Sequence, residues 1–161
     1  MPCLWASSLW WLINMESRSE IRRRLLRARK TAKTHMDAIC SADPLTYPLL
    51  KQELRQFILA KFLLDEEGIP EDVGFDRLVE ESLSHSMKID PSLVAEFDTA
   101  KSCDGATSAM AKKVLLFMTL ERELGLQLPA LETARVKTLE DISQMFFRTM
   151  QNTAVWQSRI K

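Results

Sequence analysis

The chain has 161 residues, enough for one compact domain of ordinary size plus an extension. Its 22 basic and 22 acidic residues leave no net charge that would favour a nucleic acid or an anionic membrane as partner. The three cysteines are odd in number and widely spaced, which is not the pattern of a disulfide framework, so we expect a reducing, cytoplasmic location.

Residues 1–14, MPCLWASSLWWLIN, are apolar but carry no basic start of a signal peptide. They are also shorter than the roughly 20 apolar residues that cross a bilayer, so no membrane span is predicted. Met15 begins a polar composition, and we interpret it as the natural start, with residues 1–14 an extension outside the fold. The alternative is an interfacial anchor built on three tryptophans.

Residues 15–48 form a basic helical arm and a linker in this interpretation. From Ser19 to Ile39, apolar or small residues recur at spacings of three and four, which predicts a long helix with one narrow apolar stripe. The arginines, among them the candidate partner-binding residues Arg22, Arg23 and Arg24, are either a phosphate-contacting arm or a solvated face. We favour the solvated face, because no aromatic residues for base stacking alternate with the arginines, and nucleic acid is not the expected partner.

Two further helices are predicted after the Pro-rich break at Ser41–Pro48. The first runs from Leu49 to Leu64, and the segment Asp65–Gly68 ends it with a glycine stop. Acidic residues at a helix C-terminus oppose the macrodipole, so this end should fray or meet a cation. The second helix runs from Phe75 to Met87 and has an acidic outer face.

The next segment offers no assembled site. A short helical turn is expected at Leu93–Phe97, followed by a polar loop at Asp98–Thr107 that holds Cys103. Cys103 is a candidate thiol acceptor, but no nearby histidine or second cysteine activates it, so an inert thiol is favoured. His35 and His85 lie in unrelated contexts and do not predict a zinc site.

The C-terminal third has the strongest pattern. A helix capped by Thr107 or Ser108 runs to Leu124, and its broad apolar surface predicts a central helix covered on more than one side. Gly125 ends it. Thr138 then caps a last helix, with an acid placed three residues later as in a capping box. The pattern leaves open whether Trp156 in the tail folds back or lies free.

The order of these elements resembles the acyl carrier and peptidyl carrier proteins. That family has a hydrophobic-x-hydrophobic-Pro link after its central helix and a hydrophobic-x-Thr-hydrophobic-x-Asp start to its last helix. The matching residues are Leu126, Leu128, Pro129, Val136, Thr138, Leu139 and Asp141. The resemblance covers about Phe75–Phe147. It implies an all-α, carrier-protein-like bundle of about four helices with an added N-terminal helical extension, with the domain at 49–150 and a tail at 151–161.

The resemblance implies a protein that presents an acyl or aminoacyl group on 4′-phosphopantetheine to partner enzymes. The family attaches this group to the serine of an Asp-Ser-Leu motif, which does not occur in this chain, and Met110 stands at the serine's place. Ser108 is the nearby hydroxyl and the candidate attachment site, at a helix start where N–H groups can hold a phosphate. An ordinary N-cap is the favoured alternative for Ser108.

Lys112 and Lys113 stand where the family presents acids, so they are candidate partner-binding residues toward enzymes of the ligase, synthase or transferase class. An enzyme is not expected, since no nucleophile–base pair, metal cluster or glycine-rich phosphate loop is seen. The alternative function is an unmodified carrier-fold protein that acts as a protein–protein interaction adaptor. A third possibility is that the arginine-rich helix binds nucleic acid.

Overall fold

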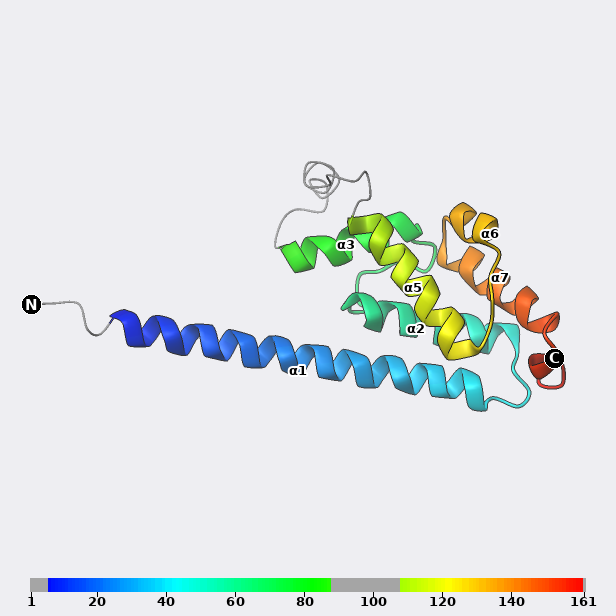
Figure 1. Ribbon diagram of the computed structural model, residues 1–161, viewed down its shortest axis with the longest axis horizontal. Coiled ribbons are helices and arrows are strands. Elements are labelled where there is room, and N and C mark those ends of the chain that lie inside the picture. The colour runs from blue at the N-terminus through cyan, green and yellow to red at the C-terminus, as the bar shows by residue number, and fades with distance from the viewer. Residues whose placement is uncertain (1–5, 88–107, 161) are drawn as a thin grey trace, which may run out of the picture.

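The structure is a computed structural model that describes residues 6–87 and 108–160. Helices dominate this part of the chain (Figure 1). They are α1 (Ala6–Ser41), α2 (Tyr47–Phe62), α3 (Phe75–Met87), α5 (Ser108–Leu124), α6 (Ala130–Arg135), α7 (Leu139–Gln151) and α8 (Ala154–Gln157). The predicted all-α class is confirmed for the described residues. The helical turn expected at Leu93–Phe97 and the loop that holds Cys103 lie outside them.

α1 and α2 are antiparallel and pack along the second half of α1 (Figure 1). The buried positions of the α1 stripe are Ala32, Met36 and Ile39, as the periodicity predicted. The first half of α1 projects beyond α2, so Ile21 and Leu25 on the same stripe remain exposed. In the described part of the chain, no helix is both long enough and apolar enough to cross a bilayer.

α2 ends earlier than the sequence predicted. Leu63 adopts a left-handed conformation, with φ 58°, and the N–H of Leu64 bonds back to the carbonyl of Leu59 at 3.0 Å. This turn brings the buried side chain of Leu64 into the core. The predicted stop at Gly68 is therefore wrong, because apolar burial turns the chain before the glycine is reached.

The expected cation at the acidic end of α2 is present. Arg24 on α1 donates from Nη2 to the carbonyl oxygen of Leu63 at 3.0 Å, where the helix dipole is negative. Farther along, the guanidinium of Arg55 donates to the carbonyls of Ile69 at 2.7 Å and Pro70 at 3.2 Å. These bonds fix the path of the loop between α2 and α3.

Three phenylalanines join α2, α3 and α5. The rings of Phe62 and Phe75 stack with centroids 6.1 Å apart, and Phe117 meets Phe75 edge to face at 5.9 Å. α7 packs on α2 and buries the residues that its pattern predicted, namely Leu139, Ile142, Met145 and Phe146. The core therefore gathers around α2, with buried side chains from α1, α3, α5 and α7.

α5 has the predicted length but a different environment. Its buried residues are Leu116, Phe117, Leu120 and Leu124. Val114, Leu115 and Met118 are exposed by 52, 62 and 58%. The prediction that this helix is covered on more than one side is wrong, because a wide apolar arc does not reveal how many layers pack against it.

The segment from α5 to α7 is held by local bonds. Gly125, with φ 63°, ends α5 as predicted, and the N–H of Leu128 donates to Glu121 Oε1 at 2.7 Å. α6 forms between the Leu126–Pro129 link and Thr138, where the sequence predicted no helix. The capping box of α7 is confirmed, since Thr138 Oγ1 accepts from Asp141 N–H while Asp141 Oδ2 accepts from Thr138 N–H.

The C-terminal residues fold back onto the bundle. Trp156 is buried and donates from Nε1 to the carbonyl of Leu124 at 3.1 Å, which answers the open question about the tail. Arg159 donates to the carbonyl of Cys40 at 2.5 Å, and the N–H of Leu45 donates to the carbonyl of Arg159 at 2.5 Å. The tail thus closes over the turn between α1 and α2.

Candidate functional site

Ser108 is the first residue of α5, and its side chain is exposed. α5 is 17 residues long, so the positive end of its helix dipole favours an anion near Ser108. Met110, at the place of the family's serine, is 57% exposed in the first turn of the helix. Cys103, the other candidate acceptor, lies outside the described residues.

Lys112 is half-buried against α2. Its ammonium lies 5.3 Å from the centroid of the Phe62 ring, a cation–π distance. Burial lowers the pKa of Lys112 from its ordinary value. This lysine therefore packs within the chain and presents little of its charge to a partner.

Lys113 likewise contacts residues of α3. Its Nζ makes an ion pair with Asp76 Oδ1 and lies 5.5 Å from the ring centroid of Phe75. Burial lowers the pKa of Lys113 even though a carboxylate lies against the ammonium. Lys112 and Lys113 therefore hold α5 against α2 and α3.

The three candidate arginines lie on α1. Arg23 donates from Nε to the carbonyl of Ser19 at 3.4 Å, and Arg24 bonds the end of α2. Arg22 is exposed. Because Arg24 reaches Leu63 and Lys112 lies over the adjacent Phe62, these two cations approach the same end of α2, which the sequence did not predict.

The exposed residues Val114, Leu115 and Met118 form what we call the α5 face. They recur at one-turn spacing along the helix, opposite the residues that build the core. Leu131 on α6 is a further exposed apolar residue, at 64%. The sequence indicated these residues as apolar, but only the structure separates them from the core.

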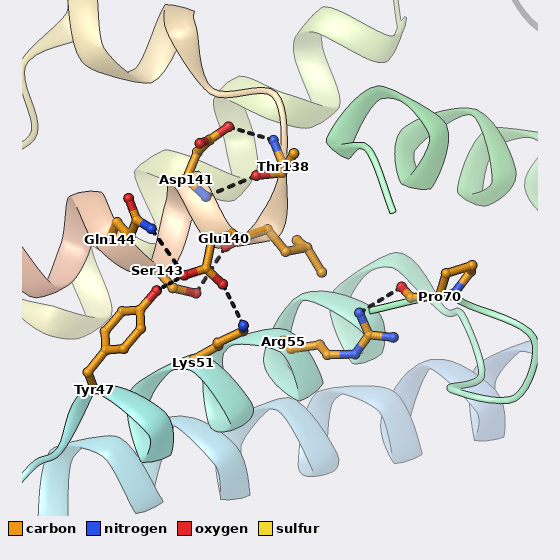
Figure 2. A network of polar contacts seen from close by, with 10 residues as sticks. Tyr47, Lys51, Arg55, Pro70, Thr138, Glu140, Asp141, Ser143 and Gln144 are labelled. Carbon is orange, nitrogen blue, oxygen red and sulfur yellow. Dashed lines mark hydrogen bonds and ion pairs between the residues drawn. The ribbon is translucent and has the colours of Figure 1, made fainter. Parts of the chain in front are cut away.

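A polar network joins α2 to α7 (Figure 2). Glu140 accepts at Oε1 from the hydroxyl of Tyr47 and from Gln144 Nε2, and its Oε2 lies 2.5 Å from Lys51 Nζ. Hydrogen bonds from Lys51 and Tyr47 lower the pKa of Glu140 to about 2. Burial, followed by the bond to Glu140, raises the pKa of Tyr47 to about 12.

The chemistry of this network suits it to hold α2 against α7 and not to transfer protons. Both oxygens of Glu140 are occupied at neutral pH, and the low pKa keeps the carboxylate ionised, so it is a poor proton acceptor for a substrate. Tyr47 and Glu140 are 93 positions apart, and nothing in either local pattern indicated that they meet. The network therefore could not be predicted from the sequence.

In the parts of the chain that the structure describes, no three His, Cys, Asp or Glu side chains are grouped so that they could hold a metal ion. No family model, no curated protein and no solved structure matches the chain.

Proposed function

We propose that the chain is an interaction module of carrier-protein-like architecture that docks on a partner enzyme through the α5 face. The observation that carries the proposal is the exposure of Val114, Leu115 and Met118 on a helix whose other side is built into the core. The order of α5, the Leu126–Pro129 link and the capped α7 supports the architectural part. This is the adaptor alternative of the sequence analysis.

The contacts of the two lysines predict how the complex responds to salt. Lys112 packs on Phe62. Lys113 packs on Phe75 and pairs with Asp76. Because both ammonium groups have partners within the chain, the early part of α5 offers a binding partner apolar surface rather than free charge. Apolar contacts are screened little by salt. The complex should therefore persist at raised ionic strength, unlike one steered by surface lysines.

A photo-crosslinking amino acid at Met118 tests the docking face in the natural host. The crosslinked protein is identified by mass spectrometry, purified and titrated with the full chain by calorimetry. Leu115→Asp and Met118→Asp should each weaken binding at least tenfold, because each places a charge in an apolar contact. Both side chains are more than half exposed, so the fold should be kept.

Val155→Asp is the matched control, since Val155 is 74% exposed on α8 and lies outside the α5 face. It should bind as the unsubstituted chain does. Unchanged affinity of the Leu115 and Met118 variants for the purified partner would exclude the α5 face as the docking site.

A second candidate function is the phosphopantetheine carrier itself, serving enzymes of the ligase, synthase or transferase class. The observation that favours it is the exposed hydroxyl of Ser108 at the first residue of α5. In this reaction a transferase moves the 4′-phosphopantetheine of coenzyme A to the serine oxygen and releases adenosine 3′,5′-bisphosphate.

Intact mass after incubation with coenzyme A and a broad-specificity transferase tests the carrier. A phosphopantetheine mass gain should appear, should vanish in Ser108→Ala and should remain in Ser158→Ala, another exposed serine. A chain that gains no mass with several such transferases is not a carrier, and the adaptor function alone then stands.

A further inference from the structure

α1 has two halves with different surroundings. Its second half packs on α2, but the helix continues past the end of α2, and Figure 1 shows this first half extending away from the bundle. Every side chain from Ser19 to Arg27 is exposed. A helix gains little stability from its own hydrogen bonds without a packing partner, so the exposed half would be stabilised by a surface that binds it.

The exposed half is strongly basic. From Ser19 to Lys30 its cations are Arg22, Arg23, Arg24, Arg27, Arg29 and Lys30. None of these six lies within ion-pair distance of a carboxylate of the described residues, and Arg23 and Arg24 bond only carbonyl oxygens. The nearby acids are Glu20, Asp65 and Glu66, which line a groove with three of the arginines. A local surplus of positive charge remains, although the whole chain is neutral.

Apolar residues accompany these charges. Ile21, Leu25 and Leu26 are exposed by 57, 50 and 55% between the arginines. Upstream on the same helix, residues 9–13 read Leu-Trp-Trp-Leu-Ile, and no charged residue precedes Glu16. Tryptophan favours the boundary between water and hydrocarbon, and an apolar segment followed by cations combines the two signals that hold a helix at a membrane surface.

We propose that the first half of α1 binds the surface of an anionic lipid bilayer. The apolar residues enter the headgroup boundary and the arginines contact lipid phosphates. The binding is interfacial, since no helix of the described residues is fit to cross the bilayer. The proposal does not depend on the α5 face or on modification of Ser108.

A bilayer fits these residues better than the other anionic or apolar partners. A nucleic acid would engage the arginines but would leave Ile21, Leu25 and Leu26 in water. A second copy of the chain would cover the apolar residues but would bring two sets of unpaired cations together. An anionic bilayer satisfies both kinds of residue at once.

Flotation of the full chain with vesicles tests the proposal. The chain should float with vesicles of phosphatidylcholine and phosphatidylserine, bind vesicles of phosphatidylcholine alone far less, and dissociate as salt is raised. Each cation at an anionic surface strengthens binding about fivefold. The triple variant Arg22→Gln, Arg29→Gln and Lys30→Gln should therefore bind about 100-fold more weakly.

A matched triple variant controls for net charge. Arg122→Gln, Arg135→Gln and Lys137→Gln remove the same number of exposed cations from α5, α6 and the turn before α7, and this variant should keep most of its affinity. Ile21→Ser with Leu25→Ser should weaken binding as well. Far-UV circular dichroism and thermal melting check that all three variants fold.

Several outcomes would overturn the proposal. One is equal binding to both kinds of vesicle, and another is equal loss in the two triple variants. A third is a chain that does not float but forms a dimer that Ile21→Ser and Leu25→Ser dissociate. A salt-sensitive complex with duplex DNA or RNA in the absence of vesicle binding would assign the arginines to nucleic acid instead.

Discussion

At the scale of single residues, Glu140 joins two helices that are far apart in the sequence. Its carboxylate accepts hydrogen bonds from Lys51 and Tyr47 on α2, and those bonds lower its pKa to about 2. Because the folded pKa lies below the ordinary value of 4.5, the contribution of the carboxylate to stability is full above about pH 4.5. It is lost as the pH falls from there toward 2.

Glu140→Gln should therefore lower the free energy of unfolding at pH 7 by about 1 kcal/mol. The side chain is 38% exposed, so solvent screening reduces the effect below what the pKa alone would give. Urea denaturation followed by circular dichroism from pH 7 to pH 3 should show the gap from the unsubstituted chain closing below pH 4.5. Glu132→Gln, at an exposed acid of α6, should show no gap; a gap for Glu140→Gln that does not vary with pH would contradict the account.

Trp156 is the residue through which the tail contributes to the core. Trp156→Ala should destabilise the fold by about 3–5 kcal/mol, because it removes a large buried ring and leaves the carbonyl of Leu124 without its indole donor. Guanidinium denaturation measures the change. The neighbouring variant Val155→Ala should differ by less than about 0.5 kcal/mol, and equal effects of the two would mean that Trp156 is not buried in solution.

At the scale of elements, α7 depends on its capping box. Thr138→Ala removes the oxygen that accepts from Asp141 N–H and should lower the free energy of unfolding by about 1 kcal/mol. Thr119→Ala, in the middle of α5, is the matched control and should be neutral or slightly stabilising, since alanine favours a helix interior. Chemical denaturation measures both variants. Equal destabilisation by Thr138→Ala and Thr119→Ala would mean that the capping bond has no special effect on stability.

The elements were predictable where local chemistry sets them. α3 spans Phe75–Met87 and α5 spans Ser108–Leu124, as the sequence predicted, because periodicity marks both helices and Gly125 ends α5. The end of α2 at Leu63 was missed, because a tertiary contact of Leu64 overrode the glycine signal. α6 was missed because a helix of six residues carries too little periodicity to be recognised.

The candidate site was less predictable than the elements. The positions of Ser108 and of the apolar residues of α5 follow from a local pattern, so the sequence could indicate them. The engagement of Lys113 by Asp76 joins residues 37 apart, and no local pattern indicates it. Residues that meet only through packing can therefore be assigned only from the fold.

At the scale of the whole molecule, the packed bundle and the projecting half of α1 should differ in resistance to protease. Because the segment from Ser19 to Arg27 has no buried side chains, trypsin should cut after Arg22–Arg24 before it cuts after Lys51 or Lys61 on α2. The masses of early fragments give the order. In the presence of anionic vesicles the cuts in α1 should slow, whereas first cuts within α2 would contradict the difference between the two parts.

The closure of the tail has a consequence for how the protein folds during synthesis. The turn after α1 is held by Arg159, and Leu124 at the end of α5 is held by Trp156, so early and late parts of the chain complete one another. Folding during translation tends to proceed from the N-terminus. Here the bond of Arg159 to Cys40 and the bond of Trp156 to Leu124 cannot form until residues 156–160 have left the ribosome, so the turn between α1 and α2 and the end of α5 are the last parts to be fixed.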